Sequence, residues 1–458
     1  LGPTLLPRRQ NESRARLHES GRHPLPRTHS TAIMITPTSH HNVDVVVLGA
    51  GIVGVSAALA LQAQGKRVCL VDRQEPGHGT SFGNAGLIER ASLVPYAFPR
   101  QPGELLRHAS NRHSALRLQW RSLPWYASWL WRYWRESAPA RLAKATEDMR
   151  PLIELCVAEH QPLISAANLH DIVRDGGWIE LVRGQKAFAE LSRQAQDDAR
   201  RWGLNIEVLP DNALRACLPG LRPEGGITGG IHWQDPWTVQ SPVRLVEGYA
   251  GLFRSRGGQF IHADAMALQQ TEQGWRLPLP DGTELHASDV VLALGADTGT
   301  LAERFGYRLP LRPKRGYHLH FRIDGAHPAP SFPVCDRDSG FVLAEMNDGV
   351  RLTTGVELAL PDAPPNDSQA RQATRIARQF WPLGEKVESE PWMGRRPCTP
   401  DMRPIIGPAP HHRGLWFDVG HAHHGLTLGP VSGRLLAELM TGQQPFTDPS
   451  PYSVQRFL

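Results

Sequence analysis

Three glycines near the beginning of the chain have the spacing that a bound pyrophosphate requires. Residues 49–54 read Gly-Ala-Gly-Ile-Val-Gly. Gly49 permits a tight turn, Gly51 lets the backbone approach a pyrophosphate, and Gly54 allows a helix to pack closely on a strand. Asp72 follows eighteen residues after Gly54 and can accept hydrogen bonds from ribose hydroxyls. This spacing predicts a dinucleotide site.

The segments around the glycines supply the elements that such a site needs. Val43–Leu48 is rich in β-branched residues and predicts a strand buried on both faces. Residues 57–64 favour a helix that ends at Gly65, and residues 67–71 predict a second strand that ends at Asp72. An acid at that position disfavours a ribose 2′-phosphate, which leaves NAD or FAD as the dinucleotide.

Composition excludes several other classes of protein. The chain has 458 residues, of which 40% are apolar and 21% charged, so it can bury a core and is not disordered throughout. Residues 1–33 contain six Arg and two Glu and account for +4 of the net charge of +5. The remainder is nearly neutral, which argues against nucleic acid as a partner. Five scattered Cys without a C-x-x-C pair favour a reducing compartment.

The first residues have the composition of an extension and not of a folded element. Residues 1–41 have no apolar period, and the first methionine is Met34. Their Arg-rich character is typical of an organelle transit peptide, but we prefer an extension upstream of a start at Met34. Residues 1–41 are therefore expected to be disordered.

Two further regions resemble the D-amino acid oxidase-like (DAO) family of FAD-dependent oxidoreductases. Residues 79–86, Gly-Thr-Ser-Phe-Gly-Asn-Ala-Gly, are similar to the family's loop beneath the isoalloxazine ring. Residues 391–407 resemble its substrate-arginine segment. Residues 415–419, 420–427 and 428–440 resemble its last strand, closing flavin loop and final helix. With further matches at 177–191, 287–297, 313–317 and 350–357, the resemblance spans residues 42 to about 445 and is closest to bacterial D-amino acid dehydrogenases.

The resemblance implies an α/β fold with two domains. One is a discontinuous, doubly wound, Rossmann-like FAD-binding domain, expected in residues 42–91, 239–305 and 393–445. The other is an inserted substrate domain of antiparallel sheet plus helices, expected in residues 92–238 and 306–392.

The resemblance also implies FAD as the cofactor. Relatives that tether flavin covalently use a Cys where this chain has Gly394, and Cys398 lies four positions later, so we expect non-covalent FAD. The closing loop departs from the family's Gly-His-Gly-His, because Ala422 replaces the second Gly and His424 is extra. The implied cofactor-binding residues are Gly49, Gly51, Ile52, Val53, Gly54, Asp72, Arg73, Ser81, Asn84, Ala85, Gly86, Met266, Gly295, Gly420, Gly425, Leu426 and Thr427.

Two residues are implied to bind substrate. Arg396 aligns with the family's carboxylate-binding arginine, and a guanidinium grips a carboxylate through two parallel bonds. Tyr317 can add a hydroxyl to the same carboxylate, although a core or rim tyrosine explains it equally well. Arg395 is expected to be structural or solvent-facing, and an alignment error of one position would exchange it with Arg396.

Two other clusters have both a structural and a functional interpretation. His421, His423 and His424 are better explained by the flavin loop than by a metal site, because no acid or Cys ligand accompanies them in the sequence. Residues 120–135 hold five Trp with interleaved Arg; we expect core packing, with peripheral membrane contact as the alternative.

The implied reaction is the oxidative deamination of a D-amino acid. Arg396 would hold the carboxylate while hydride leaves Cα for flavin N5, and the imine would hydrolyse to a 2-oxo acid and ammonia. Electrons would pass to a quinone or another acceptor, in an enzyme expected in the cytoplasm or peripherally on the inner face of the plasma membrane. Two alternatives stay open: a secondary-amine or D-hydroxyproline oxidase or dehydrogenase, and a non-catalytic FAD-binding subunit of a complex.

Overall fold

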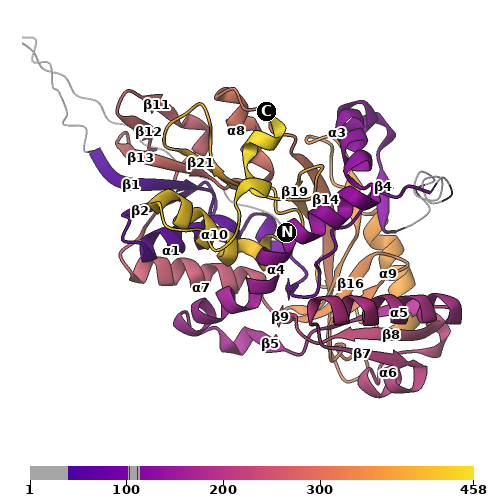
Figure 1. Ribbon diagram of the computed structural model, residues 1–458. Helices are drawn as coiled ribbons and strands as arrows, with labels where there is room; N and C mark the ends of the chain where they lie inside the picture. Colours follow the sequence, from indigo (N-terminus) through magenta and orange to yellow (C-terminus); the bar gives the residue numbers. More distant parts are fainter. Residues whose placement is uncertain (1–39, 102, 104–110, 112–113) are drawn as a thin grey trace, which may run out of the picture. The chain divides into compact units, whose positions relative to one another are not determined.

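The β-branched run ahead of the glycine motif forms the central strand of a largely parallel sheet. The structure is a computed structural model that describes residues 40–101, 103, 111 and 114–458 (Figure 1). The predicted disordered extension therefore lies outside the described residues, except for residues 40 and 41, which already belong to the first strand. The strands of this first sheet are β1 His40–Leu48, β2 Val68–Asp72, β10 Gln259–His262, β11 Gln269–Thr271, β12 Gly274–Pro278, β13 Glu284–Leu292, β20 Ile405–Pro408 and β21 Leu415–Val419.

The core of the first sheet is parallel, as a doubly wound fold requires. Strands β10, β2, β1, β13 and β21 lie side by side in that order, and each pairs with its neighbour in parallel. Strands β11, β12 and β20 join it in antiparallel orientation. Three segments that are far apart in the sequence, residues 40–72, 259–292 and 405–419, share this sheet. The domain is therefore discontinuous in sequence.

Strand β1 is buried on both faces, which explains its continuous apolar run. Val45 and Val47 pack into a core with four helices, whereas Val46 and Leu48 pack into a second core with β12 and a short helix. Alternation of side chains along the strand sends them to opposite faces. The helices on the first face are α1 Ile52–Ala63, α4 Pro139–Ala166, α7 Pro242–Ser255 and α10 Gly425–Thr441, and the short helix on the second is α8 Thr298–Arg304.

A second, mostly antiparallel sheet forms the other half of the described chain. Its order is β4, β18, β14, β17, β16, β15, β6, β8, β7, with β19 added beside β14. The strands are β4 Leu116–Leu118, β6 Trp178–Arg183, β7 Ile206–Pro210, β8 Ile227–Trp233, β14 Arg312–Phe321, β15 Val334–Asp336, β16 Phe341–Met346, β17 Gly349–Thr353, β18 Val356–Leu358 and β19 Trp392–Cys398. Helices α5 Gln185–Trp202, α6 Asp211–Cys217 and α9 Ser368–Phe380 pack on it (Figure 1).

Two elements lie on the other side of the domain boundaries drawn from the sequence. Strand β19, expected in the dinucleotide domain, pairs with β14 along its length and belongs to the second sheet. Helix α4, expected in the substrate domain, packs against α10 and α7 and contributes Leu152 and Ile153 to the helical core of the first sheet. The fold class predicted from the sequence, an α/β doubly wound domain combined with an antiparallel sheet and helices, is confirmed.

Smaller elements connect the two sheets. Strands β3 Leu87–Ile88, β5 Val173–Asp175 and β9 Trp237–Val239 form a three-stranded sheet. Helix α3, Leu123–Glu136, buries Tyr126, Trp129 and Tyr133, while Trp120 just before it and Trp131 on it are exposed. In the described part of the chain, no helix has the length and apolar character needed to cross a membrane.

Candidate functional site

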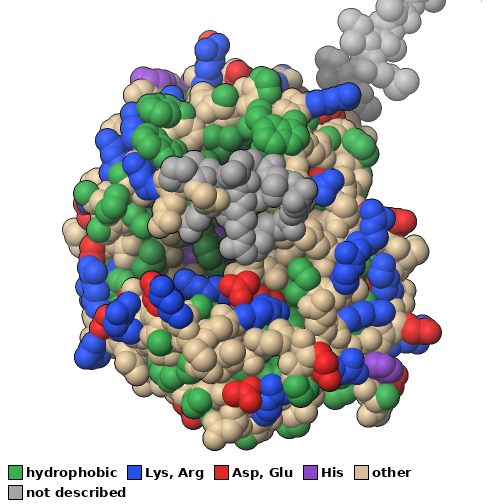
Figure 2. Space-filling model, turned by 90° about the vertical axis from the view of Figure 1, so that its right-hand side faces the viewer, with side chains coloured by type: hydrophobic (Ala, Val, Ile, Leu, Met, Phe, Trp, Pro, Cys, Tyr) green, Lys and Arg blue, Asp and Glu red, His purple; other side chains and the backbone are tan. Residues whose placement is uncertain are grey.

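A cavity of about 1100 Å³ is lined by residues of both sheets. Its walls include the loop after β1, the ends of β2 and β21, the beginning of α10, and strands β14 and β19. Figure 2 shows a hollow on one face of the protein, bordered below by acidic and basic side chains. The two ends of the cavity are built differently, one mainly from backbone and the other from charged side chains.

The turn between β1 and α1 tolerates only glycine at two positions. Gly49 has φ +106°, and a Cβ there would lie 2.4 Å from the carbonyl oxygen of Ala293. A Cβ on Gly54 would lie 1.8 Å from the carbonyl oxygen of Gly49. These two glycines do not line the cavity themselves; they let α1 begin directly behind its wall.

The first turn of α1 presents backbone N–H groups to the cavity. Gly51, Ile52 and Val53 line it, and the hydroxyl of Ser81 accepts a hydrogen bond from the Ile52 N–H at 3.0 Å. A helix N-terminus carries unpaired donors and a partial positive charge, which suits an anion. This end of α1 therefore has the chemistry of a phosphate site.

Acidic side chains lie along the same end of the cavity. The Asp72 carboxylate accepts the N–H groups of Ala50 at 2.7 Å and Gln74 at 3.0 Å, which fixes it at the end of β2. Asp297 pairs with Arg73 at 3.1 Å and with Arg395 at 2.9 Å. Asp297, which follows β13 of the first sheet, therefore holds Arg395 in an ion pair. This contact agrees with the expectation that Arg395 is structural or solvent-facing.

The loop between β21 and α10 closes this end. Asp418, His421 and His424 line the cavity, and neither Oδ1 of Asp418 nor Nε2 of either histidine forms a hydrogen bond, although Nε2 of His421 lies 3.4 Å from Oδ1 of Asp418. Burial raises the pKa of Asp418 well above its usual range and lowers the pKa of His421 to about 3 and that of His424 to about 4. Both imidazoles are therefore neutral at physiological pH, and the loop can offer uncharged donors and acceptors to a bound group.

A buried histidine supports the first turn of α10 from behind. Nε2 of His160 on α4 lies 2.7 Å from the carbonyl oxygen of Leu426, and Nδ1 lies 2.8 Å from the hydroxyl of Tyr249. Burial lowers the pKa of His160 to about 4, so the ring is neutral and Nε2–H donates to the carbonyl. No local sequence pattern indicates this contact, which joins residues 266 positions apart.

Most of the sequence-predicted cofactor residues line the one cavity, and four do not. Gly86 has φ +75° and would place a Cβ 2.2 Å from the carbonyl oxygen of Val239, so it shapes the loop from outside the cavity. The hydroxyl of Thr427 accepts the N–H of Glu89 at 3.1 Å and thereby fixes β3 to α10. Gly49 and Gly54 act through the turn. The lining members of the set are Gly51, Ile52, Val53, Asp72, Arg73, Ser81, Asn84, Ala85, Met266, Gly295, Gly420, Gly425 and Leu426.

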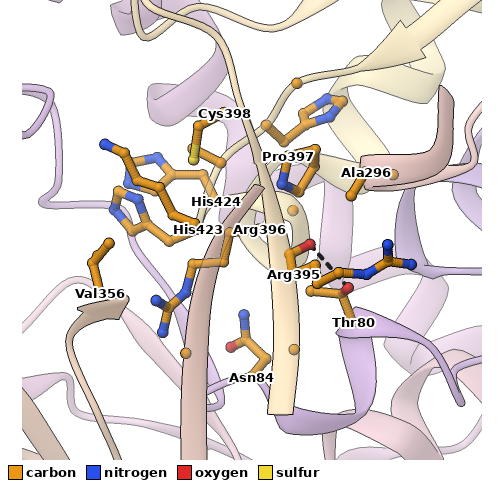
Figure 3. A pocket seen from close by; sticks show the side chains of 18 of the residues that line it. Thr80, Asn84, Ala296, Val356, Arg395, Arg396, Pro397, Cys398, His423 and His424 are labelled. Atoms are coloured by element: carbon orange, nitrogen blue, oxygen red, sulfur yellow. Dashed lines mark hydrogen bonds between the residues drawn. The ribbon is translucent and has the colours of Figure 1, made fainter. Parts of the chain in front are cut away.

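Arg396 of β19 lies at the other end of the cavity, where its guanidinium donates to two backbone carbonyl groups. Its guanidinium donates to the carbonyl oxygens of Gly355 at 2.9 Å and Thr354 at 3.2 Å. No carboxylate among the described residues forms an ion pair with it, and burial lowers its pKa. Figure 3 shows the side chains of Arg395 and Arg396 leaving β19 on opposite sides, as neighbours on a strand must. Arg396 is thus a half-buried cation that faces the cavity, suited to a carboxylate ligand.

Tyr317 is a correction to the sequence-based site. Its side chain is 1% exposed and is absent from the cavity wall, where Lys314 and Gly316 of the same strand lie. Its hydroxyl donates to the carboxylate of Glu357 and accepts the Asn366 N–H at 3.1 Å. Burial and the Glu357 contact raise the pKa of Tyr317 to about 12. The hydroxyl is committed to the core behind the strand and is not available to a ligand in the cavity.

Two residues that the sequence did not single out stand beside Arg396. Lys314 lies directly opposite Arg396 in the β14–β19 pairing, and its Nζ lies 4.1 Å from the ring centroid of Tyr133. The Tyr96 ring lies 4.9 Å from that of His423, and Tyr96 is 66% exposed because it projects into the open cavity. The strand pairing of 314 with 396 joins segments 82 residues apart, so local pattern carries no sign of it.

The histidines of the closing loop do not form a metal-type cluster in the described part of the chain. The cluster of suitable ligands found there is His318, His320 and Glu388. Within it, Nε of Arg351 donates to Nε2 of His320 at 2.9 Å, so a buried cation already holds that nitrogen. The same guanidinium donates to the carbonyl oxygens of Phe82 and Asn84 and fixes the loop beneath the cavity.

Comparison with known proteins identifies the family. The sequence profile described as FAD dependent oxidoreductase (DAO) matches residues 44–439. The chain belongs to this family. It is 28% identical over 419 residues to D-amino acid dehydrogenase of Chromohalobacter salexigens, covering 90% of this chain and 99% of that protein. It is 29% identical over 434 residues to D-amino-acid oxidase of Bradyrhizobium diazoefficiens, with 90% and 99% covered.

A solved structure of a family member has the same fold. The crystal structure of glycine oxidase from Geobacillus kaustophilus superposes with a TM-score of 0.69 over 91% of this chain and all of that chain, at 22% sequence identity. The predicted identity of the protein as a DAO family FAD-dependent oxidoreductase is therefore confirmed, and FAD is its cofactor.

The described residues of this FAD-dependent oxidoreductase fit the cofactor. The glycine turn leaves room for a backbone approach that a Cβ would block, and the α1 N-terminus faces the cavity. The orphaned polar atoms of Asp418, His421 and His424 lie around the α10 N-terminus, where a polar ring edge would supply their partners.

Proposed function

We propose that this FAD-dependent oxidoreductase oxidises a D-amino acid to a 2-oxo acid and ammonia. The substrate gives up two electrons and two protons to become an imine, which water hydrolyses. The observation that carries the proposal is Arg396, a half-buried guanidinium that faces the cavity without a carboxylate partner among the described residues. The names of its relatives, D-amino acid dehydrogenase and D-amino-acid oxidase, support the D configuration.

The protein's own residues bind and orient the substrate. Two parallel N–H bonds from Arg396 would fix the carboxylate, while its bonds to Gly355 and Thr354 keep the guanidinium plane in place. Lys314, opposite Arg396 and against the Tyr133 ring, adds positive potential at the same end. Bound FAD supplies the acceptor for the electron pair that leaves the substrate. We assign no general acid or base to the reaction.

We propose that FAD is bound without a covalent link. Gly394 occupies the position of the tethering Cys, and Cys398 is buried with its pKa raised by burial, so its thiol stays protonated. Acid or heat should release all yellow colour into the supernatant. Flavin that precipitates with the chain would contradict this assignment.

The proposal has two versions, which differ in the electron acceptor. We favour transfer to a quinone or another carrier, and residues 120–135, whose inner face packs in the core, remain the candidate for peripheral membrane contact. On their outer face, Trp131 is 61% exposed and stacks on Trp134 with 5.2 Å between ring centroids, whereas the exposed Trp120 lines the cavity. Trp131→Ser should weaken flotation with anionic lipid vesicles if this face contacts a membrane. Production of one peroxide per substrate in air would instead favour an oxidase.

Anaerobic mixing with amino acids tests the reaction directly. The holoenzyme's flavin absorbance should bleach with D-amino acids and not with their L enantiomers. Bleaching only by L-amino acids or by secondary amines would reassign the substrate. No bleaching by any amine would favour a non-catalytic flavoprotein.

A further inference from the structure

Glu89 is an acidic residue of the cavity wall with no counterion among the described residues. It follows β3 directly, and its N–H is fixed by the Thr427 hydroxyl at the first turn of α10. Its Oε2 is buried and has no hydrogen-bond partner. Arg90, the next residue, forms no ion pair with Glu89 in the described part of the chain, and its own Nη1 is also buried without a hydrogen-bond partner. A buried carboxylate that lacks a cation is costly and calls for a ligand of opposite charge.

The surroundings of Glu89 increase its negative character. Burial and the charge of Glu180 on β6 raise the pKa of Glu89 to about 7, against the effect of the nearby Trp178 indole, which lowers it. Glu180 has its own partners, the guanidinium of Arg337 at 2.6 Å and the Trp233 indole at 3.3 Å. The Glu180 carboxylate therefore has its partners, whereas the Glu89 carboxylate on the cavity wall has no cation paired with it.

Tyr96 relates Glu89 to the carboxylate end of the cavity. Its ring packs on His423, beside Arg396 and Lys314, whose charges lower the pKa of that histidine. The Tyr96 hydroxyl interacts electrostatically with Glu89 and with Arg396. Because Glu89, Tyr96 and Arg396 line the same cavity, a ligand there would meet both the acid and the guanidinium.

We propose that Glu89 binds a positively charged group at the end of the substrate's side chain, so that the enzyme acts on basic D-amino acids. This inference rests on the proposed function, because it takes the Arg396 end as the site of the α-carboxylate. A cation at Glu89 would give this carboxylate a counterion that the described protein does not supply. A neutral side chain would leave the carboxylate desolvated and unpaired, which disfavours it.

A pair of substrates that differ only in the distal charge gives the sharpest test. D-lysine and D-norleucine share their carbon chain and α-amine, so their kcat/KM ratio isolates the ammonium. We expect the FAD-loaded wild type to prefer D-lysine by about ten- to a hundredfold, the range of one charge-assisted contact. Glu89→Gln keeps the shape and should abolish the preference by raising KM for D-lysine, with D-norleucine unchanged. Glu345→Gln, at a half-buried acid that pairs with Arg174 and lies outside this cavity, is the matched control.

The outcomes separate the inference from the function on which it rests. Equal use of D-lysine and D-norleucine by the wild type, or an equal loss for both in Glu89→Gln, would overturn the assignment of Glu89 and leave D-amino acid oxidation standing. Flavin that no D-amino acid reduces would overturn both. If Glu89→Gln does not fold, wild-type kcat/KM for D-arginine against neutral D-citrulline decides, because equal values contradict the proposal.

Discussion

The two ends of the cavity are built from different parts of the polypeptide. The dinucleotide end is made mainly of backbone: a glycine turn, the first N–H groups of α1, and the loop of residues 79–86. The substrate end is made of charged side chains, Arg396, Lys314 and Glu89, which come from three segments at least 82 residues apart in the sequence.

This difference determines which changes each end tolerates. At the dinucleotide end a single added Cβ collides with a carbonyl oxygen, so shape decides. At the substrate end side chains of similar size fit, and charge and hydrogen-bond geometry decide. The predictions below use changes of size at one end and changes of charge or geometry at the other.

Gly54→Val should have the largest effect. Its Cβ would lie 1.8 Å from the Gly49 carbonyl oxygen, so α1 could not begin where it does. We expect loss of bound FAD and of most soluble protein, measured by flavin absorbance per chain. Gly251→Ala on α7, with nothing within 4 Å of the new Cβ, should retain full flavin content. A yellow Gly54→Val protein would contradict the backbone account of this end.

Arg396→Lys should lower kcat/KM strongly while FAD stays bound. Lysine keeps the charge but loses the planar pair of donors, so the substrate carboxylate could pivot. A charge-assisted bond is worth about 1.5–3 kcal/mol, which corresponds to a loss of about ten- to a hundredfold or more.

Arg395→Lys is the control for that change. Arg395 pairs with Asp297 at 2.9 Å and leaves β19 on the other side, so its replacement should cost much less in kcat/KM (Figure 3). If Arg395→Lys lowered kcat/KM more than Arg396→Lys, the substrate carboxylate would be bound by Arg395 and not by Arg396.

Tyr317→Phe should affect stability and not catalysis. The hydroxyl bonds to the buried Glu357, so its loss should cost about 1–3 kcal/mol of unfolding free energy. Because the ring faces away from the cavity, kcat/KM should stay within about twofold of wild type. Chemical denaturation and steady-state kinetics on the same sample test both parts. A large loss of kcat/KM with unchanged stability would return Tyr317 to the substrate site.

The preference for D-lysine over D-norleucine should rise with pH by less than about tenfold between pH 6 and pH 8. Burial and Glu180 raise the pKa of Glu89 to about 7, so its carboxyl is mostly neutral below that pH and charged above it. The other groups that face it are Tyr96 and the Glu180–Arg337 pair, and the two substrates share the same α-amine. A ratio that does not vary with pH would contradict a titrating Glu89.

The sequence by itself predicted the dinucleotide end well, because that end is local. Strand, glycine turn, helix, second strand and Asp72 follow one another within thirty residues, and each requirement is steric and short in range. The last strand was predicted at Leu415–Val419, where the structure has it. The following helix begins at Gly425, three residues earlier than predicted, because the glycine joins the first turn.

Only the tertiary structure decided the substrate end. Which face of β14 meets the cavity depends on its pairing with β19, and that register puts Lys314 opposite Arg396 and turns Tyr317 into the core. The membership of β19 in the second sheet likewise follows from pairing across 82 residues. Glu89 is unpaired because residues distant in the sequence bury its carboxylate without placing a cation beside it. A side chain's type is written in the sequence, but its partners depend on strand register and on packing between segments that the sequence keeps far apart.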